Sequence, residues 1–125
     1  MSALCDAQLH LAKAEEFLTA AEVSRDLELF NAATSDAVVS GINSKDALCL
    51  KLTGKTVKSD NHTAAVAELK KAGPAGAKLA PTLQRLLKLK TRSQYQTMTI
   101  ARQDATVAVD WARNLYEGAR TVVQS

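Results

Sequence analysis

The apolar residues of this chain recur every three or four positions, which is the spacing that places side chains along one side of an α-helix. The first stripe predicts a helix over residues 3–22, and its members are Leu4, Ala7, Leu11, Ala14, Leu18 and Ala21. A second stripe predicts a helix over residues 25–53, with Ser24 or Asp26 as its N-cap. The members of this second stripe are Leu27, Phe30, Ala33, Ala37, Gly41, Ser44, Leu48 and Leu52. Small residues fill its middle, so we expect another helix to approach closely and this helix to be central.

A short basic loop is expected to follow the second helix. Gly54 stands directly after the stripe, and glycine is the residue that most often ends a helix. Lys55 to Asp60 then form the loop, and Asp60 or Asn61 is suited to cap a third helix over residues 62–72.

Two further helices complete the pattern. The chain breaks at Gly73-Pro74, and Pro81 suits the first turn of a fourth helix over residues 81–92. A fifth helix is expected to run from a cap at Thr99 to the C-terminus. Because no strand pattern competes, the predicted fold class is all-α, an antiparallel bundle of four to five helices.

Composition agrees with one helical domain over residues 1–125. Only 4% of the residues are aromatic, and strong helix formers dominate. No apolar run approaches 18 residues, so we expect no membrane span. The N-terminus lacks the features of a signal peptide, and Cys5 and Cys49 form no CxxC motif. We therefore expect a cytoplasmic protein with reduced thiols.

The positive charge is concentrated in the middle of the chain. Residues 1–50 hold three basic residues against eight acidic ones, a net charge of −5. Residues 51–92 hold ten basic residues against two acidic ones, a net charge of +8. Such a block favours an anionic partner, nucleic acid first. The alternative is a solvated surface that pairs with the acidic first helices.

Several common sites are excluded by spacing. Gly54-Lys55-Thr56 is similar to the end of a phosphate-binding P-loop, but the earlier glycine and the preceding strand of that motif are missing. The spacings of the cysteines and histidines fit no zinc signature; these residues are Cys5, His10, Cys49 and His62. No hydrolase motif is present. We therefore expect neither a metal nor a cofactor.

His62 is the main candidate for chemistry. It lies in the first turn of the predicted third helix, where exposed N–H groups favour anions and a neutral imidazole. Beside Lys55 and Lys58, such an imidazole can move a proton from a ribose 2′-hydroxyl while the lysines hold the phosphate. The alternative is a histidine that only bonds to a loop carbonyl at the start of its helix.

Two blocks of sequence carry a family resemblance. The first joins residues 44–50 to residues 60–66, SKDALCL and DNHTAAV, across the basic loop. The second is LLKLKTRSQY at residues 86–95, followed by a helix that starts near Asp104. In order, spacing and residue type, the chain resembles small bacterial HEPN-domain proteins. The resemblance covers nearly the whole chain, although residues 1–25 carry no motif.

The resemblance implies a four- or five-helix bundle that forms a homodimer. Many such proteins are metal-independent endoribonucleases of toxin–antitoxin, defence or RNA-processing systems. Their site is an arginine followed, after four to six residues, by a histidine, and His62 takes the histidine role here. The sequence has no arginine in that window, and Lys55 and Lys58 are the cations that stand near it.

Further roles also follow from the resemblance. Asp46 would orient His62, and the cleavage would leave a 2′,3′-cyclic phosphate without a metal. The candidates for contact with the substrate are Lys51, Lys88, Arg92 and Tyr95. The expected partners are RNA, a second copy of the chain, and an antitoxin or other protein. The alternative function is a catalytically inactive helical binding module with a protein or nucleic-acid partner.

Overall fold

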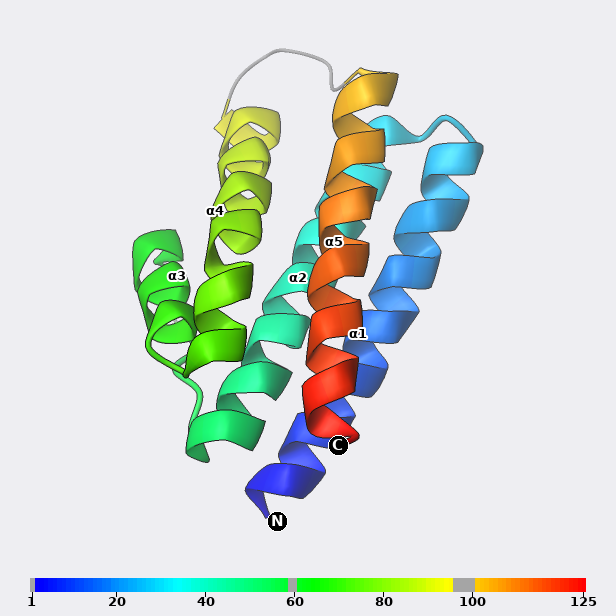
Figure 1. Ribbon diagram of the computed structural model, residues 1–125. Helices are drawn as coiled ribbons and strands as arrows, with labels where there is room; N and C mark the ends of the chain where they lie inside the picture. The colour runs from blue at the N-terminus through cyan, green and yellow to red at the C-terminus, as the bar shows by residue number, and fades with distance from the viewer. Residues whose placement is uncertain (1, 59–60, 96–100) are drawn as a thin grey trace.

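Five helices make up the protein in the computed structural model, which describes residues 2–58, 61–95 and 101–125 (Figure 1). Within residues 91–95, it describes the backbone alone. The helices are α1 (Ala3–Asp26), α2 (Phe30–Thr53), α3 (His62–Lys70), α4 (Pro74–Tyr95) and α5 (Arg102–Val123). These described parts of the chain contain no strand, so the predicted all-α class is confirmed.

The four long helices form an antiparallel bundle, with α1 and α4 running in one direction and α2 and α5 in the other (Figure 1). Helix α2 packs against each of the other four helices, as the prediction of a central helix requires. The short α3 lies on the outer side of α4, away from α1 (Figure 1). Both chain termini lie at the same end of the bundle.

The small residues of α2 allow α4 and α5 to approach it closely. A Cβ atom placed on Gly41 would lie 2.6 Å from Leu86 Cδ2 and 3.2 Å from Leu115 Cδ1. Both leucines are fully buried, so their side chains fill the space that the glycine leaves. The close packing predicted at this position is therefore confirmed.

The predicted apolar stripes face the core, and their outer ends are the exceptions. On α1 the buried members are Ala7, Leu11, Ala14, Leu18 and Ala21. Leu4, Leu27 and Leu52 are exposed instead. Leu4 lies in the first turn of α1 and Leu52 in the last turn of α2, while Leu27 follows the end of α1.

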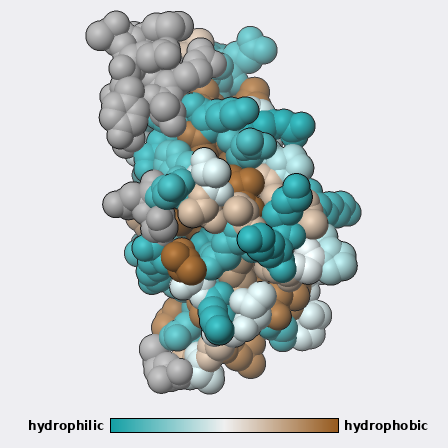
Figure 2. Space-filling model, turned by 90° about the vertical axis from the view of Figure 1, so that its left-hand side faces the viewer, coloured by the Kyte–Doolittle hydropathy of each residue, from teal (hydrophilic) through white to brown (hydrophobic). Residues whose placement is uncertain are grey.

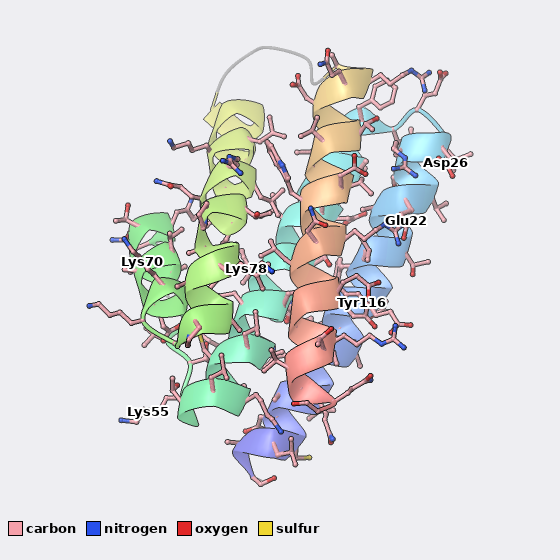
Figure 3. All side chains as sticks on the ribbon, in the orientation of Figure 1. Glu22, Asp26, Lys55, Lys70, Lys78 and Tyr116 are labelled. Atoms are coloured by element: carbon pink, nitrogen blue, oxygen red, sulfur yellow. The ribbon has the colours of Figure 1, made fainter. Side chains whose placement is uncertain are left out.

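Polar contacts hold α1 against its two neighbours. Ser40 Oγ donates a hydrogen bond of 2.7 Å to the carbonyl oxygen of Ala14, which joins α2 to α1. Tyr116 Oη donates a bond of 2.5 Å to Glu15, which joins α5 to α1 (Figure 3). Burial, together with this bond to a carboxylate, raises the pKa of Tyr116 to about 12, so the phenol remains a donor at neutral pH.

The predicted boundary between the first two helices is wrong. Ser24 and Asp26 both lie within α1, which continues to Asp26 because these residues and their neighbours are compatible with helix. The chain reverses at Glu28, whose φ of +64° is in the left-handed region. Helix α2 then begins at Phe30, and its N-cap, Leu29, makes no side-chain capping bond.

The predicted start of the fourth helix is also wrong. Helix α4 begins at Pro74, because Gly73 adopts a φ of +113° that lets the chain turn and proline suits a first helical position. Pro81 lies inside the helix, where it has no N–H to donate to the carbonyl of Ala77. Helix α4 also continues to Tyr95, beyond the predicted end at residue 92.

Two predicted helix signals are confirmed. Gly54 adopts a φ of +79° after α2 and donates its N–H to the carbonyl of Leu50, and Asn61 caps α3 by accepting a bond from the N–H of Ala64. The predicted third helix extends too far, because α3 ends at Lys70. Helix α5 begins at Arg102 after an Ala101 N-cap, and Thr99 lies outside the described residues.

A test of the α3–α4 contact is the substitution Gly76→Ala. A Cβ at this position would lie 2.2 Å from the backbone oxygen of Leu69 and 3.1 Å from Ala72 Cβ. We expect the overpacking to lower the free energy of unfolding by about 1–3 kcal/mol, measured by urea denaturation. The exposed Lys78→Ala on the same helix is the control, with a change within about 0.5 kcal/mol. A Gly76→Ala protein as stable as the wild type would contradict the close approach.

Candidate functional site

A buried ionic cluster lies where α2, α3 and the loop between them meet. The side chain of Lys45 is 2% exposed, and its ammonium donates to Asp46 Oδ1 at 3.0 Å and pairs with Glu68. The same ammonium donates to Thr56 Oγ1 at 3.2 Å and to the carbonyl oxygen of Val57 at 3.1 Å. In return, Thr56 donates to Asp46 at 2.6 Å, and the N–H of Val57 donates to Glu68 at 2.7 Å. We call Lys45, Asp46, Thr56 and Glu68 the Lys45 cluster.

Lys45 and Glu68 hold each other in the ionised state. Burial by itself would lower the pKa of Lys45, but the bonds and charges of Glu68 and Asp46 raise that pKa above its ordinary value. Burial by itself would raise the pKa of Glu68, but the bonds from Lys45 and from the N–H of Val57 lower it. The cluster therefore fixes the loop after α2 against both helices.

His10 on α1 lies beside the Lys45 cluster. Its Nδ1 is 2.9 Å from Asn43 Oδ1 and 4.0 Å from Asp46 Oδ2. Asn43 uses its Nδ2 group to donate to the carbonyl oxygen of Val39 at 2.9 Å. The asparagine oxygen therefore faces the ring, which assigns the proton of a neutral imidazole to Nδ1 and the lone pair to Nε2.

A polar cavity of about 570 Å³ lies between α1 and the loop after α2. We call it the α1–loop pocket, and it is lined by Asp6, Leu9, His10, Lys13, Leu50, Gly54, Lys55, Thr56 and Lys58. The three lysines are exposed, whereas the His10 side chain is 15% exposed. The pocket thus combines one oriented imidazole with three mobile cations.

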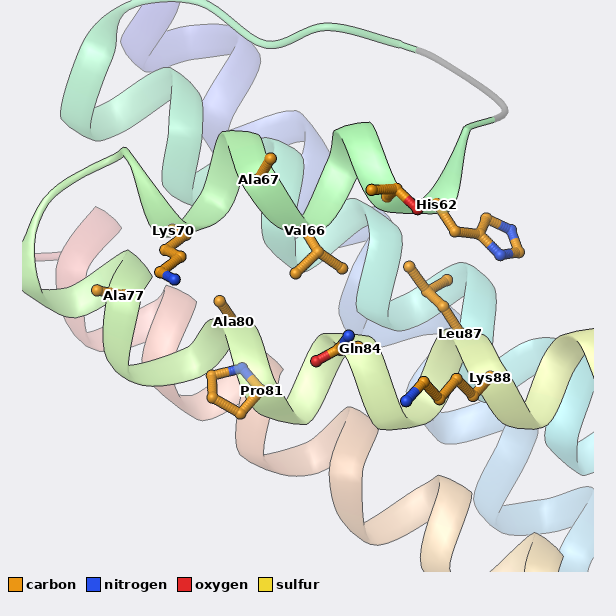
Figure 4. Close-up of a pocket in the computed structure, with 11 residues that line it drawn as sticks. His62, Val66, Ala67, Lys70, Ala77, Ala80, Pro81, Gln84, Leu87 and Lys88 are labelled. Carbon is orange, nitrogen blue, oxygen red and sulfur yellow. The ribbon is translucent and has the colours of Figure 1, made fainter.

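A second cavity, of about 450 Å³, lies between α3 and α4. We call it the α3–α4 groove, and it is lined by His62, Thr63, Val66, Ala67, Lys70, Ala77, Ala80, Pro81, Gln84, Leu87 and Lys88. The imidazole of His62 stands at the end where α3 begins, Lys70 stands at the opposite end, and Val66 points toward α4 between them (Figure 4). The groove is therefore mainly apolar, with Gln84 as a polar residue along its length and with Lys70 and Lys88 as its cations.

The face of the molecule that carries α3 is largely hydrophilic, with smaller apolar areas between the polar side chains (Figure 2). Lys55 extends outward from the loop after α2 (Figure 3), and Lys70 on α3 is exposed. The basic block predicted from the sequence thus contributes cations to a solvent-facing surface.

The predicted site residues do not line a single cavity. His62 and Lys88 line the α3–α4 groove, whereas Lys55 and Lys58 line the α1–loop pocket. Asp46 accepts hydrogen bonds from Lys45 and Thr56, and its second oxygen lies beside His10.

Three other candidates for contact with the substrate are not among the described residues that line the groove or the pocket. Lys51 is half-buried near the end of α2 and is not part of the lining of the groove or the pocket. Arg92 and Tyr95 belong to the last turns of α4, but their side chains lie outside the described residues.

Sequence reasoning missed the residues that build the α1–loop pocket on the α1 side. His10 and Lys13 are three positions apart, so they share one side of a helix, and this spacing was the available signal. The inward orientation of Lys45 and Asp46 carried no such signal, because charged residues in an amphipathic helix normally face solvent.

Other chemistry has limited support in the described residues. Among residues 2–58, 61–95 and 101–125, no group of three or more His, Cys, Asp or Glu side chains could hold a metal ion. Burial raises the pKa of the Cys49 thiol to about 12, which leaves it protonated and unreactive at neutral pH. None of the described helices has the length and apolar character needed to cross a membrane.

A first prediction concerns the charge at the centre of the Lys45 cluster. Lys45→Met keeps an unbranched side chain but leaves Asp46 and Glu68 without their shared cation. We expect the free energy of unfolding to fall by about 3–5 kcal/mol in urea denaturation. Lys71→Met removes an exposed lysine as the control, and its effect should stay within about 0.5 kcal/mol. Equal effects of the two substitutions would show that the cluster is not a stabilising ion pair.

A second prediction concerns pH. The pKa of Glu68 in the folded protein is below its ordinary value of 4.5, so the unfolded state binds a proton first as pH falls. The stability contributed by this group is therefore present above pH 4.5 and is lost as pH falls through the lower folded value. We expect Glu68→Gln to flatten the acid side of a stability-versus-pH curve, measured from urea midpoints. An unchanged acid slope would contradict the assignment.

A comparison with protein-family models matches residues 7–122 to the HEPN domain. A search of curated proteins found no significant match. The matched segment contains the Lys45 cluster and both cavities, apart from the contribution of Asp6 to the pocket. The family predicted from the two sequence blocks is therefore confirmed. By the extent of this match, the chain belongs to the HEPN-domain family.

Proposed function

We propose that this HEPN domain binds RNA along the α3–α4 groove. The observation that carries the proposal is the combination of an apolar lining, including Val66, Ala77 and Pro81, with Lys70 and Lys88. Nucleobases can pack on apolar side chains, and lysines neutralise the phosphates between them. The exposure of both lysines leaves their ammonium groups accessible to a flexible strand.

The reaction that this arrangement would support is metal-independent cleavage of RNA. The imidazole of His62, at the start of α3, would accept the proton of a ribose 2′-hydroxyl. The 2′-oxygen would form a bond to phosphorus while the bond from phosphorus to the 5′-oxygen breaks, and a water molecule would donate a proton to that leaving oxygen. Lys88 would offset the charge on the phosphate. The products would be a 2′,3′-cyclic phosphate and a 5′-hydroxyl.

A specific observation favours a second candidate function, a binding module without catalysis. The loop lysines that the family resemblance would place beside His62, Lys55 and Lys58, line the α1–loop pocket instead. No arginine is among the described residues that line the α3–α4 groove. Lysine neutralises a phosphate as a point charge but lacks the planar fork of arginine. Binding therefore needs only cations that neutralise the phosphates, whereas cleavage would also gain from the planar fork that the described groove residues lack.

The cleavage test uses mixed single-stranded RNA in excess EDTA. We expect the wild-type protein to release fragments with 2′,3′-cyclic phosphate ends, and His62→Ala to reduce the rate about 100-fold or more. If His62→Ala still binds RNA, the lower rate arises in the cleavage step and not in RNA binding. If the RNA stays intact, or if the variant cleaves as fast as the wild type, the nuclease reaction is wrong and only the binding proposal is left.

The binding test compares two pairs of exposed lysines. The double variant Lys70→Gln/Lys88→Gln removes the groove cations, and Lys71→Gln/Lys78→Gln removes the same charge outside the groove lining. We expect the first pair alone to lower the slope of log K against log salt by about 1.4, which is the value for two phosphate contacts to a single strand. Equal slopes for both double variants would contradict binding in the groove.

Three finer features stay predictions for this chain. The N-terminus and the cysteine pattern predict the cytoplasmic location. The family resemblance predicts the homodimer and the role beside an antitoxin, in a toxin–antitoxin or defence system. Sedimentation equilibrium of the purified chain would measure the oligomeric state, and a monomer at micromolar concentration would contradict the homodimer.

A further inference from the structure

We propose that the α1–loop pocket is a second site, separate from the α3–α4 groove, and that it binds a phosphate group. In this site Lys13, Lys55 and Lys58 neutralise the phosphate, and His10, as an imidazolium, donates to it from Nε2. The proposal does not rest on the proposed function, because no residue is shared between the linings of the two cavities.

The charge around the pocket favours an anion. Lys13 comes from α1, and Lys55 and Lys58 come from the loop after α2, so two segments far apart in the chain converge on one cavity. Among the described residues of the lining, Asp6 is the one carboxylate, and it opposes an anion. Three cations against one carboxylate leave a net positive charge in a concave site, which attracts a phosphate.

His10 is oriented for contact with a ligand. Its Nδ1 faces Asn43 Oδ1 at 2.9 Å, with Asp46 Oδ2 behind it at 4.0 Å. Asn43 is 6% exposed and Asp46 is 5% exposed, so both groups that hold the ring belong to the interior. Such buried support fixes the ring and leaves Nε2 directed away from the interior, so that the protonated ring can donate its second N–H to a phosphate oxygen.

Hydrogen bonds to the Lys45 cluster hold the loop wall of the pocket in place. Thr56 Oγ1 donates to Asp46 at 2.6 Å, and Val57 is held through both its N–H and its carbonyl group. Lys55 and Lys58 flank these two anchored residues. Their backbones are therefore fixed beside His10, while their long side chains can still adjust to a bound phosphate.

This placement gives Gly54-Lys55-Thr56 a role other than that of a P-loop. All three residues line the pocket. In a P-loop the threonine hydroxyl would coordinate a magnesium ion, but here the hydroxyl of Thr56 is occupied by the Lys45 cluster. The lysine is thus the part of the motif that can reach an anion.

The ligand chemistry is a phosphate group, which two sources could present. One is a small free phosphate compound, and the other is the terminal phosphate of an RNA strand. Pyrophosphate tests the first source, and a 5′-phosphorylated RNA hexamer tests the second, with the same hexamer bearing a 5′-hydroxyl as its control.

The chain contains two histidines, one in each cavity, which makes ring NMR a direct test. The imidazole signals are assigned with His10→Gln and His62→Gln, and each probe is titrated at pH 7. We expect a saturable shift of the His10 signal with pyrophosphate or with the phosphorylated hexamer, and a smaller response to the 5′-hydroxyl hexamer. A His62 response to both hexamers reports the groove, so failure of the proposed function would be seen separately.

Matched lysine variants test whether the lysines of the pocket cause the response of the His10 signal. Lys55→Gln/Lys58→Gln should weaken the His10 response about five- to tenfold, as the loss of two exposed charge contacts implies. Lys71→Gln/Lys78→Gln, which removes the same charge elsewhere, should leave it unchanged. A His10 signal that no probe moves would overturn the proposal. So would equal weakening by the two double variants.

Discussion

The positions of both cavities depend on the contacts that the buried ammonium of Lys45 makes. Lys45 belongs to α2, yet its partners include Glu68 on α3 and Thr56 and Val57 in the loop. An ion in a helical interior costs several kcal/mol unless its partners stay in place. Because the loop forms one wall of the α1–loop pocket and α3 forms one wall of the α3–α4 groove, one cluster sets the geometry of both.

The two cavities use the basic block of the sequence in different ways. The α3–α4 groove carries Lys70 and Lys88 on an otherwise mainly apolar lining, which suits a strand with exposed bases. The α1–loop pocket gathers Lys55 and Lys58 around His10, which suits a compact anion. The division follows from the loop, since its anchoring at Thr56 and Val57 fixes the backbones of the neighbouring lysines in the wall of the α1–loop pocket.

Local sequence predicted the helices well but misplaced the starts of α2 and α4. The three-four periodicity identified each buried face, and Gly54 and Asn61 marked their helix ends correctly because those signals act through nearby backbone groups. Pro74 and Pro81 both satisfy the preference of proline for a first turn, so the sequence could not choose between them. The left-handed turn at Gly73 made Pro74 the start. The candidate site was predicted less well, because His62 and Lys55 line different cavities.

The sequence by itself determined the all-α fold, the central helix with its small residues at Gly41, the positive middle segment and a histidine at the start of the third helix. These features depend on helical spacing, on local caps and on charge, all of which can be read within a few turns. Only the tertiary structure decided that Lys45 and Asp46 face inward and that His10 meets the loop lysines. The physical reason is that buried ion pairs form between segments far apart in the chain, and their pairing depends on how whole helices pack.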